Sequence, residues 1–207
     1  MIAVIDYGMG NLRSVAKALE EIGAKIKITS SANVIRKASK IVFPGVGSFY
    51  DGLKELSKRG LIKPIKSAIR DKKPFLGLCL GLQLLFEESQ EAPNIKGLGI
   101  LEGKIKRIPP EVNRKRLKVP HIGWNQIHLT KRGKESRLFR GIKDGSFVYF
   151  VHSYVAIPED SSIISTITEY GIKFCSSISK DNIYATQFHP EKSQEVGLKI
   201  LKNFIEI

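Results

Sequence analysis

Apolar and polar positions follow two different patterns along the chain, and the pattern changes near the middle. In the first half, short apolar runs predict strands at 1–6, 24–30, 38–45 and 73–81. Between them, apolar residues recur at helical spacing, which predicts helices over 12–23, 49–73 and 82–89. The second helix is expected to break near Gly60 and Pro64. Strands that alternate with helices predict a parallel sheet with helices on both faces.

From about Gly97 the pattern changes to shorter alternating segments separated by turn residues. These segments predict strands at 98–108, 123–130, 145–157, 162–168 and 173–190. The closing stretch 195–207 has the spacing of an amphipathic helix. No internal repeat or low-complexity linker interrupts the chain. We therefore predict one α/β domain over 1–207, with a mostly parallel central sheet, helices on both faces and an antiparallel extension packed on that sheet.

Composition argues against several classes of protein, namely membrane-spanning, disulfide-rich and zinc-binding proteins. The chain has 207 residues, 42% of them hydrophobic, which is enough for a sizeable core. No apolar run approaches a membrane span, and residues 1–8 lack the pattern of a secretory signal, so we expect a cytoplasmic protein without membrane partners. Two cysteines cannot form a disulfide framework, and no His/Cys pairs stand at zinc-ligand spacing, so no metal is expected.

The formal net charge of +14 raises the possibility of a nucleic-acid partner. Lysine and arginine are spread along the whole chain, and the densest basic run, 104–118, contains no aromatic residue that would stack on bases. We predict a solvated hairpin or loop there and no nucleic-acid binding. A patch for an acidic partner or a phosphorylated ligand is the alternative, and the overall basicity has no explanation in the sequence.

The segment FLGLCLGLQ places Cys79 where a predicted strand turns into a helix, with Gly77 and Gly81 on either side. A reactive thiol needs a tight, exposed turn near the positive end of a helix, and two flanking glycines permit such a bend. Taken alone, the pattern is equally compatible with a small buried hydrophobe. A nucleophilic Cys79 also needs a base and a group that orients the base.

Four histidines could serve as that base: His121, His128, His152 and His189. His189 follows an apolar strand, Pro190 ends that strand, and Glu191 can turn back to the imidazole. His152 is the serious rival, but no glutamate follows it. His189 with Glu191 is therefore the preferred base and orienter for Cys79.

The other motifs do not indicate a catalytic or ligand-binding function. Gly8 and Gly10 resemble two glycines of a dinucleotide fingerprint, but Arg13 stands where the third should be. No phosphate-binding G-x-x-x-x-G-K-S/T loop is present, so no cofactor or nucleotide is expected. Cys175 lies in an alternating strand and is predicted to be packed rather than reactive. His121 and Trp124 fit either a core or a partner-facing role.

The segments GLCLGLQ and TQFHPEK together resemble the class I (triad) glutamine amidotransferases, whose cysteine lies in G-x-C-x-G-x-Q and whose histidine and glutamate form H-P-E. Within that family, four further segments resemble the glutaminase subunits of imidazole glycerol phosphate synthases: IDYGMGNLRSV, FPGVGSF, VPHIGWN and YFVHSYV. Leu82 stands where many relatives have methionine, a change that conserves volume. The likeness runs from residue 2 to the closing helix.

The resemblance implies a role for each matching residue. Cys79 would form a glutamyl thioester, His189 would carry the proton to ammonia, and Glu191 would hold the imidazole. The oxyanion hole would use backbone N–H groups of Leu80 and of Val46 or Gly47. The turn PGVG can also be read as a simple end of a strand. The remaining implied residues are Gln83, Ser153 and Tyr154 for the amino-acid end of glutamine, and Asn11 and Lys192 for a partner interface.

The same resemblance implies a function and a partner. The chain would hydrolyse glutamine and pass ammonia to a (βα)8-barrel cyclase that makes imidazole glycerol phosphate and an aminoimidazole carboxamide ribotide in histidine synthesis, as one half of a heterodimer. The first alternative is a paralogous amidotransferase for another acceptor, such as a surface-sugar pathway. The second is a non-catalytic basic scaffold, which the intact set of Cys79, His189 and Glu191 argues against.

Overall fold

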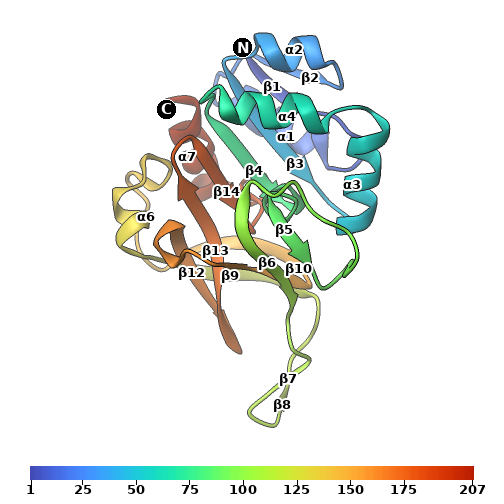
Figure 1. Ribbon diagram of the computed structural model, residues 1–207. Helices are drawn as coiled ribbons and strands as arrows, with labels where there is room; N and C mark the ends of the chain where they lie inside the picture. Colours follow the sequence, from blue (N-terminus) through green and yellow to red (C-terminus); the bar gives the residue numbers. More distant parts are fainter.

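The computed structural model describes residues 1–207, and a twelve-stranded sheet runs through the whole molecule (Figure 1). The strands are β1 Ile2–Ile5, β2 Ile26–Thr29, β3 Lys40–Gly45, β4 Phe75–Cys79, β5 Phe86–Ser89, β6 Leu101–Arg107, β9 His121–Leu129, β10 Ser146–His152, β11 Tyr154–Pro158, β12 Ile164–Tyr170, β13 Ile172–Lys180 and β14 Ile183–Thr186. A separate hairpin is formed by β7 Glu111–Val112 and β8 Lys115–Arg116.

Helices pack around this sheet and none of them is both long and apolar enough to cross a membrane. The α-helices are α1 Leu12–Glu21, α2 Ala32–Lys37, α3 Phe49–Lys58, α4 Ile62–Arg70, α5 Leu80–Gln83, α6 Lys131–Glu135 and α7 Gln194–Ile205. Three short 3-10 turns are η1 Arg137–Phe139, η2 Ser161–Ile163 and η3 Pro190–Lys192.

The parallel half of the sheet has the order β2-β1-β3-β4-β14. Successive side chains of a strand point to opposite faces. On β3, Ile41 and Phe43 therefore join a core with α2, α3 and α4, whereas Val42 joins a second core with α1 and α7. The predicted parallel sheet with helices on both faces is confirmed.

The antiparallel half continues from β14 through β13, β12, β9 and β10. Beside it, β11 joins β6 and β13, and β6 carries β5. Apart from β5, which pairs with β6 in parallel, these strands form the predicted antiparallel extension on the same sheet. The hairpin β7–β8 projects from the lower end of the molecule (Figure 1), and all its residues but Val112 are exposed. The basic run 104–118 thus ends in the predicted solvated hairpin.

The predicted helix over 82–89 is wrong. Helix α5 ends at Gln83, and residues 86–89 form the strand β5. Phe86 pairs with Leu101 of β6 and is fully buried. The spacing of apolar residues does not distinguish a short helix from a short strand. Here the segment forms a strand because it can pair with β6.

The predicted break in the long second helix lies at Gly60 and not at Pro64. Helix α3 ends at Lys58, Gly60 has a positive φ of 66°, and α4 starts at Ile62. Pro64 is in the first turn of α4, where a backbone N–H has no partner within the helix, so its missing donor costs nothing.

Candidate active site

Cys79 is the last residue of β4 and caps the N-terminus of α5. Its φ of 53° and ψ of −105° lie outside the common regions for a residue with a side chain, which indicates stored backbone strain. A Cβ on Gly81 would overlap the carbonyl oxygen of Phe43, and one on Gly77 would lie 3.0 Å from the backbone of Gly81. Both glycines are therefore required by the bend that presents the thiol.

His189 lies three residues after the end of β14, at the same end of the sheet as Cys79, because β14 and β4 are neighbouring parallel strands. Its Nδ1 lies 2.8 Å from Glu191 Oε1, and its backbone N–H donates to the Tyr149 carbonyl at 2.9 Å. Ser193 Oγ donates to the His189 carbonyl at 2.6 Å. These contacts hold the turn at Pro190 and leave Nε2 of the ring free to face the thiol.

Electrostatics favours a protonated His189. Burial alone lowers the pKa of this imidazole, but the charge of Cys79, its hydrogen bond to the ring and the carboxylate of Glu191 together raise the pKa to about 10. The ring therefore carries its proton at neutral pH. A protonated imidazole beside a nucleophilic sulfur can donate a proton to a leaving amine.

A cavity of about 310 Å³ lies in front of Cys79. It brings together most of the residues that the sequence pointed to. Its lining includes Val46, Gly47, Cys79, Leu80, Gln83, Val151, His152, Ser153, Tyr154, His189 and Lys192. Two predicted residues are not part of it: Glu191 lies behind His189, with 2% of its side chain exposed, and Asn11 caps helix α1 through a bond from Ser14 N.

The segment after β3 passes beside the thiol, since Gly45 is in register with Cys79. Val46 is 41% exposed, and Gly47 has a φ of 98°, a conformation that favours glycine. Met9 packs against Gly47, where an added Cβ would lie 2.7 Å from its methyl carbon. The loop before α1 and the segment 44–47 are thus in direct contact next to the cavity.

Two residues of this site were not identified from the sequence. Gln187 is fully buried, and its Nε2 donates to Cys79 Sγ at 3.6 Å while its Oε1 accepts from Gln83 Nε2 at 3.0 Å. Glu91 also lines the cavity, and its Oε2 accepts from Phe49 N at 2.7 Å. The available signal was that Gln187 stands two residues before His189 within the predicted strand 173–190, where alternate residues share a face.

The structure argues against His152 as the base. Burial is the main cause that lowers its pKa, to about 3. Its Nδ1 donates to the Tyr154 carbonyl at 2.9 Å and its Nε2 lies 3.0 Å from His121 Nδ1. With both ring nitrogens in use, His152 has no free lone pair for a proton from Cys79.

Cys175 is packed, as expected. It is 4% exposed, and burial raises its pKa to about 12, so it is not a nucleophile at neutral pH.

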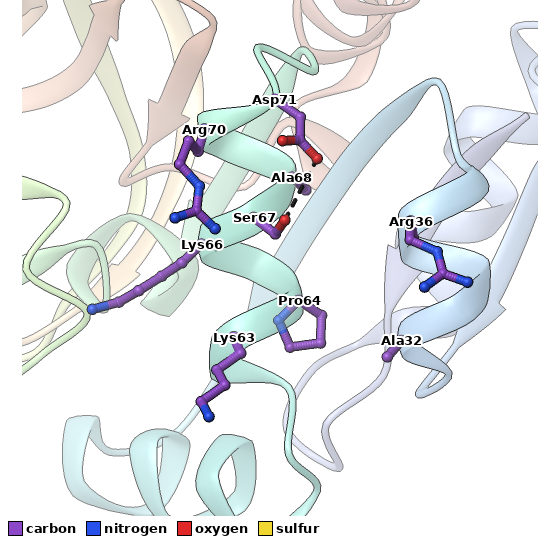
Figure 2. Close-up of a pocket in the computed structure, with 9 residues that line it drawn as sticks. All are labelled: Ala32, Arg36, Lys63, Pro64, Lys66, Ser67, Ala68, Arg70 and Asp71. Atoms are coloured by element: carbon purple, nitrogen blue, oxygen red, sulfur yellow. Dashed lines mark hydrogen bonds between the residues drawn. The ribbon is translucent and has the colours of Figure 1, made fainter.

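A larger hollow of about 480 Å³ lies between α2 and α4, away from Cys79. Its basic residues are Arg36, Lys63, Lys66 and Arg70. Figure 2 shows that the three from α4 project away from Arg36 instead of converging on a common point. It holds neither a cysteine nor a histidine, so the smaller cavity is the candidate active site.

Comparison with known proteins gives a family. The family described as Glutamine amidotransferase class-I matches residues 3–207. The chain is 48% identical over 206 residues to the imidazole glycerol phosphate synthase subunit HisH of Syntrophotalea carbinolica, covering 99% of this chain and 98% of that protein. It is 52% identical over 202 residues to the subunit of the same name from Aquifex aeolicus, covering 97% and 94%.

Solved structures agree on the fold. One described as a glutamine amidotransferase superposes with a TM-score of 0.76 at 16% identity, covering 100% of this chain and 98% of that one. A chain from the structure of PurLQS from Thermotoga maritima gives a TM-score of 0.74 at 16% identity, covering 99% and 97%. At these identities the likeness extends to the fold alone.

Proposed function

The chain belongs to the class I glutamine amidotransferases, and from this premise we propose that it is the glutaminase subunit of an imidazole glycerol phosphate synthase, acting in histidine biosynthesis. The observation that carries the proposal is the placement of a strained, cavity-facing Cys79 beside a His189 that Glu191 holds at 2.8 Å. Relatives that bear the name of this subunit match the chain over nearly its whole length. We take residues 1–207 as one glutaminase domain.

In the proposed reaction, Cys79 Sγ attacks the side-chain carbonyl carbon of glutamine as a thiolate, its proton being held by the His189 imidazolium, and forms a tetrahedral intermediate. The carbon–nitrogen bond then breaks, and the His189 imidazolium gives its proton to the leaving nitrogen, so that ammonia departs and a glutamyl thioester remains. His189 next removes a proton from water, which attacks the thioester and releases glutamate. Backbone N–H groups of Leu80 and of Val46 or Gly47 would stabilise the oxyanion in both steps.

The rest of the cavity suits the amino-acid end of glutamine. Both hydrogens of the Gln83 amide are used, by the Tyr154 carbonyl at 3.2 Å and by Gln187. Its Oε1 is left to accept from the substrate ammonium, and the carboxylate of Glu91 supplies an opposite charge in the same cavity. Backbone groups of Ser153 and Tyr154 would receive the substrate carboxylate.

A partner subunit fits the outer face of β9 and β10. On this face Ile122, Trp124 and Phe147 are 60%, 45% and 54% exposed. Large apolar side chains gathered and exposed in this way are unusual on a surface strand pair. The face adjoins the site, because Tyr149 of β10 bonds to the His189 turn and Lys192 lies over its ring. We propose that a (βα)8-barrel cyclase docks here in the cytoplasm, contacts Asn11 and Lys192, and takes up the ammonia.

The proposal is tested by comparing two nitrogen sources in the complex with its co-purified partner. Cys79→Ser should abolish synthesis from glutamine and leave synthesis from ammonium salt intact, because only the hydrolytic half is lost. Cys175→Ser is the matched control and should keep most of both activities. Loss of the ammonium-driven reaction in Cys79→Ser would make Cys79 structural instead.

Complementation identifies the acceptor. The gene should restore growth without histidine to a strain that lacks only its own glutaminase subunit of this synthase. Co-purification with a different synthase, together with failure to complement, would instead favour a paralogous amidotransferase.

A further inference from the structure

His121 and His152 form a buried pair that the reaction above does not use. They are cross-strand neighbours on β9 and β10, 3% and 5% exposed, and His121 Nδ1 lies 3.0 Å from His152 Nε2. We infer that these two histidines are positioning residues for glutamine: as a neutral hydrogen-bonded pair they hold the Ser153–Tyr154 backbone in the conformation that receives the substrate. The inference rests on the proposed glutaminase function.

The hydrogen bonds allow only one arrangement of protons in this pair. Asn125 Nδ2 donates both to the Glu169 carbonyl at 2.9 Å and to His121 Nε2 at 3.3 Å, so that ring nitrogen must accept. His121 Nδ1 therefore carries the hydrogen and donates to His152 Nε2. His152 Nδ1 in turn donates to the Tyr154 carbonyl at 2.9 Å. A proton added to either ring would set two donors against each other.

Burial keeps the pair neutral. It lowers the pKa of His121 to about 4 and is the main cause that lowers the pKa of His152 to about 3. His121 is also held by its ring, which stacks on Tyr170 at 4.0 Å and on Phe150 at 4.9 Å between centroids. The pair is thus a rigid, uncharged connector beside the charged His189.

The series of hydrogen bonds through the two histidines ends in the substrate cavity. The Tyr154 carbonyl accepts from His152 on one side and from Gln83 Nε2 on the other, which uses both lone pairs. The Ser153 carbonyl accepts from Ile108 N at 2.9 Å. Because a peptide unit is planar, fixing these two carbonyls fixes the peptide planes on both sides of the Tyr154 Cα.

From Gln83 the contacts continue through Gln187 to Cys79 Sγ. An uninterrupted series therefore links Asn125, next to the exposed Trp124, with the nucleophile. A pair that served only as core packing would not need two directed bonds in series, of which the second meets the bond from Gln83 on one backbone carbonyl of the cavity.

The test uses the assembled complex. Its variants distinguish the effect of side-chain shape from the effect of the hydrogen bonds. His152→Leu removes both bonds at similar size, whereas His152→Asn keeps an N–H close to the position of Nδ1. His121→Phe keeps the ring stacking and removes the donor to His152, together with the weaker contact to Asn125 Nδ2 at 3.3 Å. His128→Gln is the matched control, because His128 lies on the same strand β9 but is exposed and contacts Asp144.

We expect His152→Leu to raise the KM for glutamine about tenfold with little change in kcat, the size of effect that follows from losing one buried hydrogen bond. His152→Asn should recover most of this loss. His121→Phe should shift KM in the same direction, and the double variant should be no worse than His152→Leu, since the two side chains act through one carbonyl. Alkylation of Cys79 by iodoacetamide, which needs no amino-acid subsite, should proceed as in the wild type.

An unchanged KM in His152→Leu, or a fall in iodoacetamide reactivity that matches the rise in KM, would overturn the inference and leave the pair a structural one. If His152→Leu does not fold, the KM of His121→Phe decides in the same way. Failure of the wild-type complex to hydrolyse glutamine would instead refute the proposed function, so the two failures are distinct.

Discussion

Glu191 Oε1 lies 2.8 Å from His189 Nδ1, and the two side chains are only 2% and 6% exposed. The second oxygen of Glu191 is buried without a protein partner, so the carboxylate acts on the imidazole alone. A buried carboxylate on Nδ1 orients the ring so that Nε2 faces Cys79. It also stabilises the charged form of the ring.

The roles of His189 and Glu191 predict unequal losses. His189→Ala should lower kcat for glutamine hydrolysis by about 10²–10⁴, the usual contribution of a general acid–base group. Glu191→Gln should cost less, because the imidazole remains, though less well oriented and less basic. The double variant should be no worse than His189→Ala, since the two groups act as a unit. A double variant worse by the product of both losses would show that they act independently.

Folding stability should depend on pH through His189. Folding raises the pKa of this group from its ordinary 6.5 to about 10, so its stabilising contribution is complete below pH 6.5 and disappears as the pH rises through 10. Urea denaturation of the wild type and of His189→Gln at about pH 6, 8 and 10 measures this. The difference in the free energy of unfolding should shrink as the pH rises, and a difference independent of pH would contradict it.

The bend at Cys79 should not tolerate a side chain at Gly81. A Cβ there would overlap the Phe43 carbonyl oxygen, which is backbone and cannot move aside. Gly81→Ala should lower the free energy of unfolding by about 3 kcal/mol and remove glutaminase activity. Gly52→Ala in α3 is the control: its Cβ would meet Leu84 Cδ1 at 3.1 Å, a flexible neighbour, and it should change stability by less than about 1 kcal/mol. The two variants are compared by chemical denaturation and by glutamine turnover.

Glutamine hydrolysis should depend on the partner. Glycines flank Val46, so a peptide there can rotate at little steric cost and turn an N–H towards the oxyanion only when the partner favours that state. One oxyanion donor is worth about 10²–10³ in rate, which sets the expected activation. Turnover is measured for the subunit alone, with the partner, and with the partner plus its phosphoribulosyl ligand. Equal turnover in all three would refute the switch.

Gly47→Pro tests the same segment. Gly47 has a φ of 98°, whereas proline is fixed near −65° and lacks the N–H. The variant should form the complex normally and show little activation by it. Gel filtration of the complex and glutamine turnover with and without partner distinguish this from a general loss of assembly.

Much of the candidate active site could be predicted because its residues lie in short sequence segments. Gly77, Cys79 and Gly81 encode the bend by their own sterics, and Glu191 reaches His189 across a single proline. The parallel strands and their helices likewise follow from local spacing of apolar residues. In each case the residues that interact are neighbours in the chain, so the pattern itself carries the geometry.

Where the partners are distant in sequence, local pattern was not enough. The segment 86–89 has apolar spacing that suits a helix, and it becomes β5 because β6 offers a strand partner. The contact of Gln187 with Cys79 and the bond between His121 and His152 join residues that no short motif connects.

The sequence by itself determined the thiol, the histidine and the glutamate, and with them the family. Only the tertiary structure decided that they form one site, because that depends on β14 lying parallel to β4 with Thr186 in register with Leu78. This register also places Gln187 against the thiol. Strand pairing is set by the burial of both faces of the whole sheet, a property of all its strands together that no single segment carries.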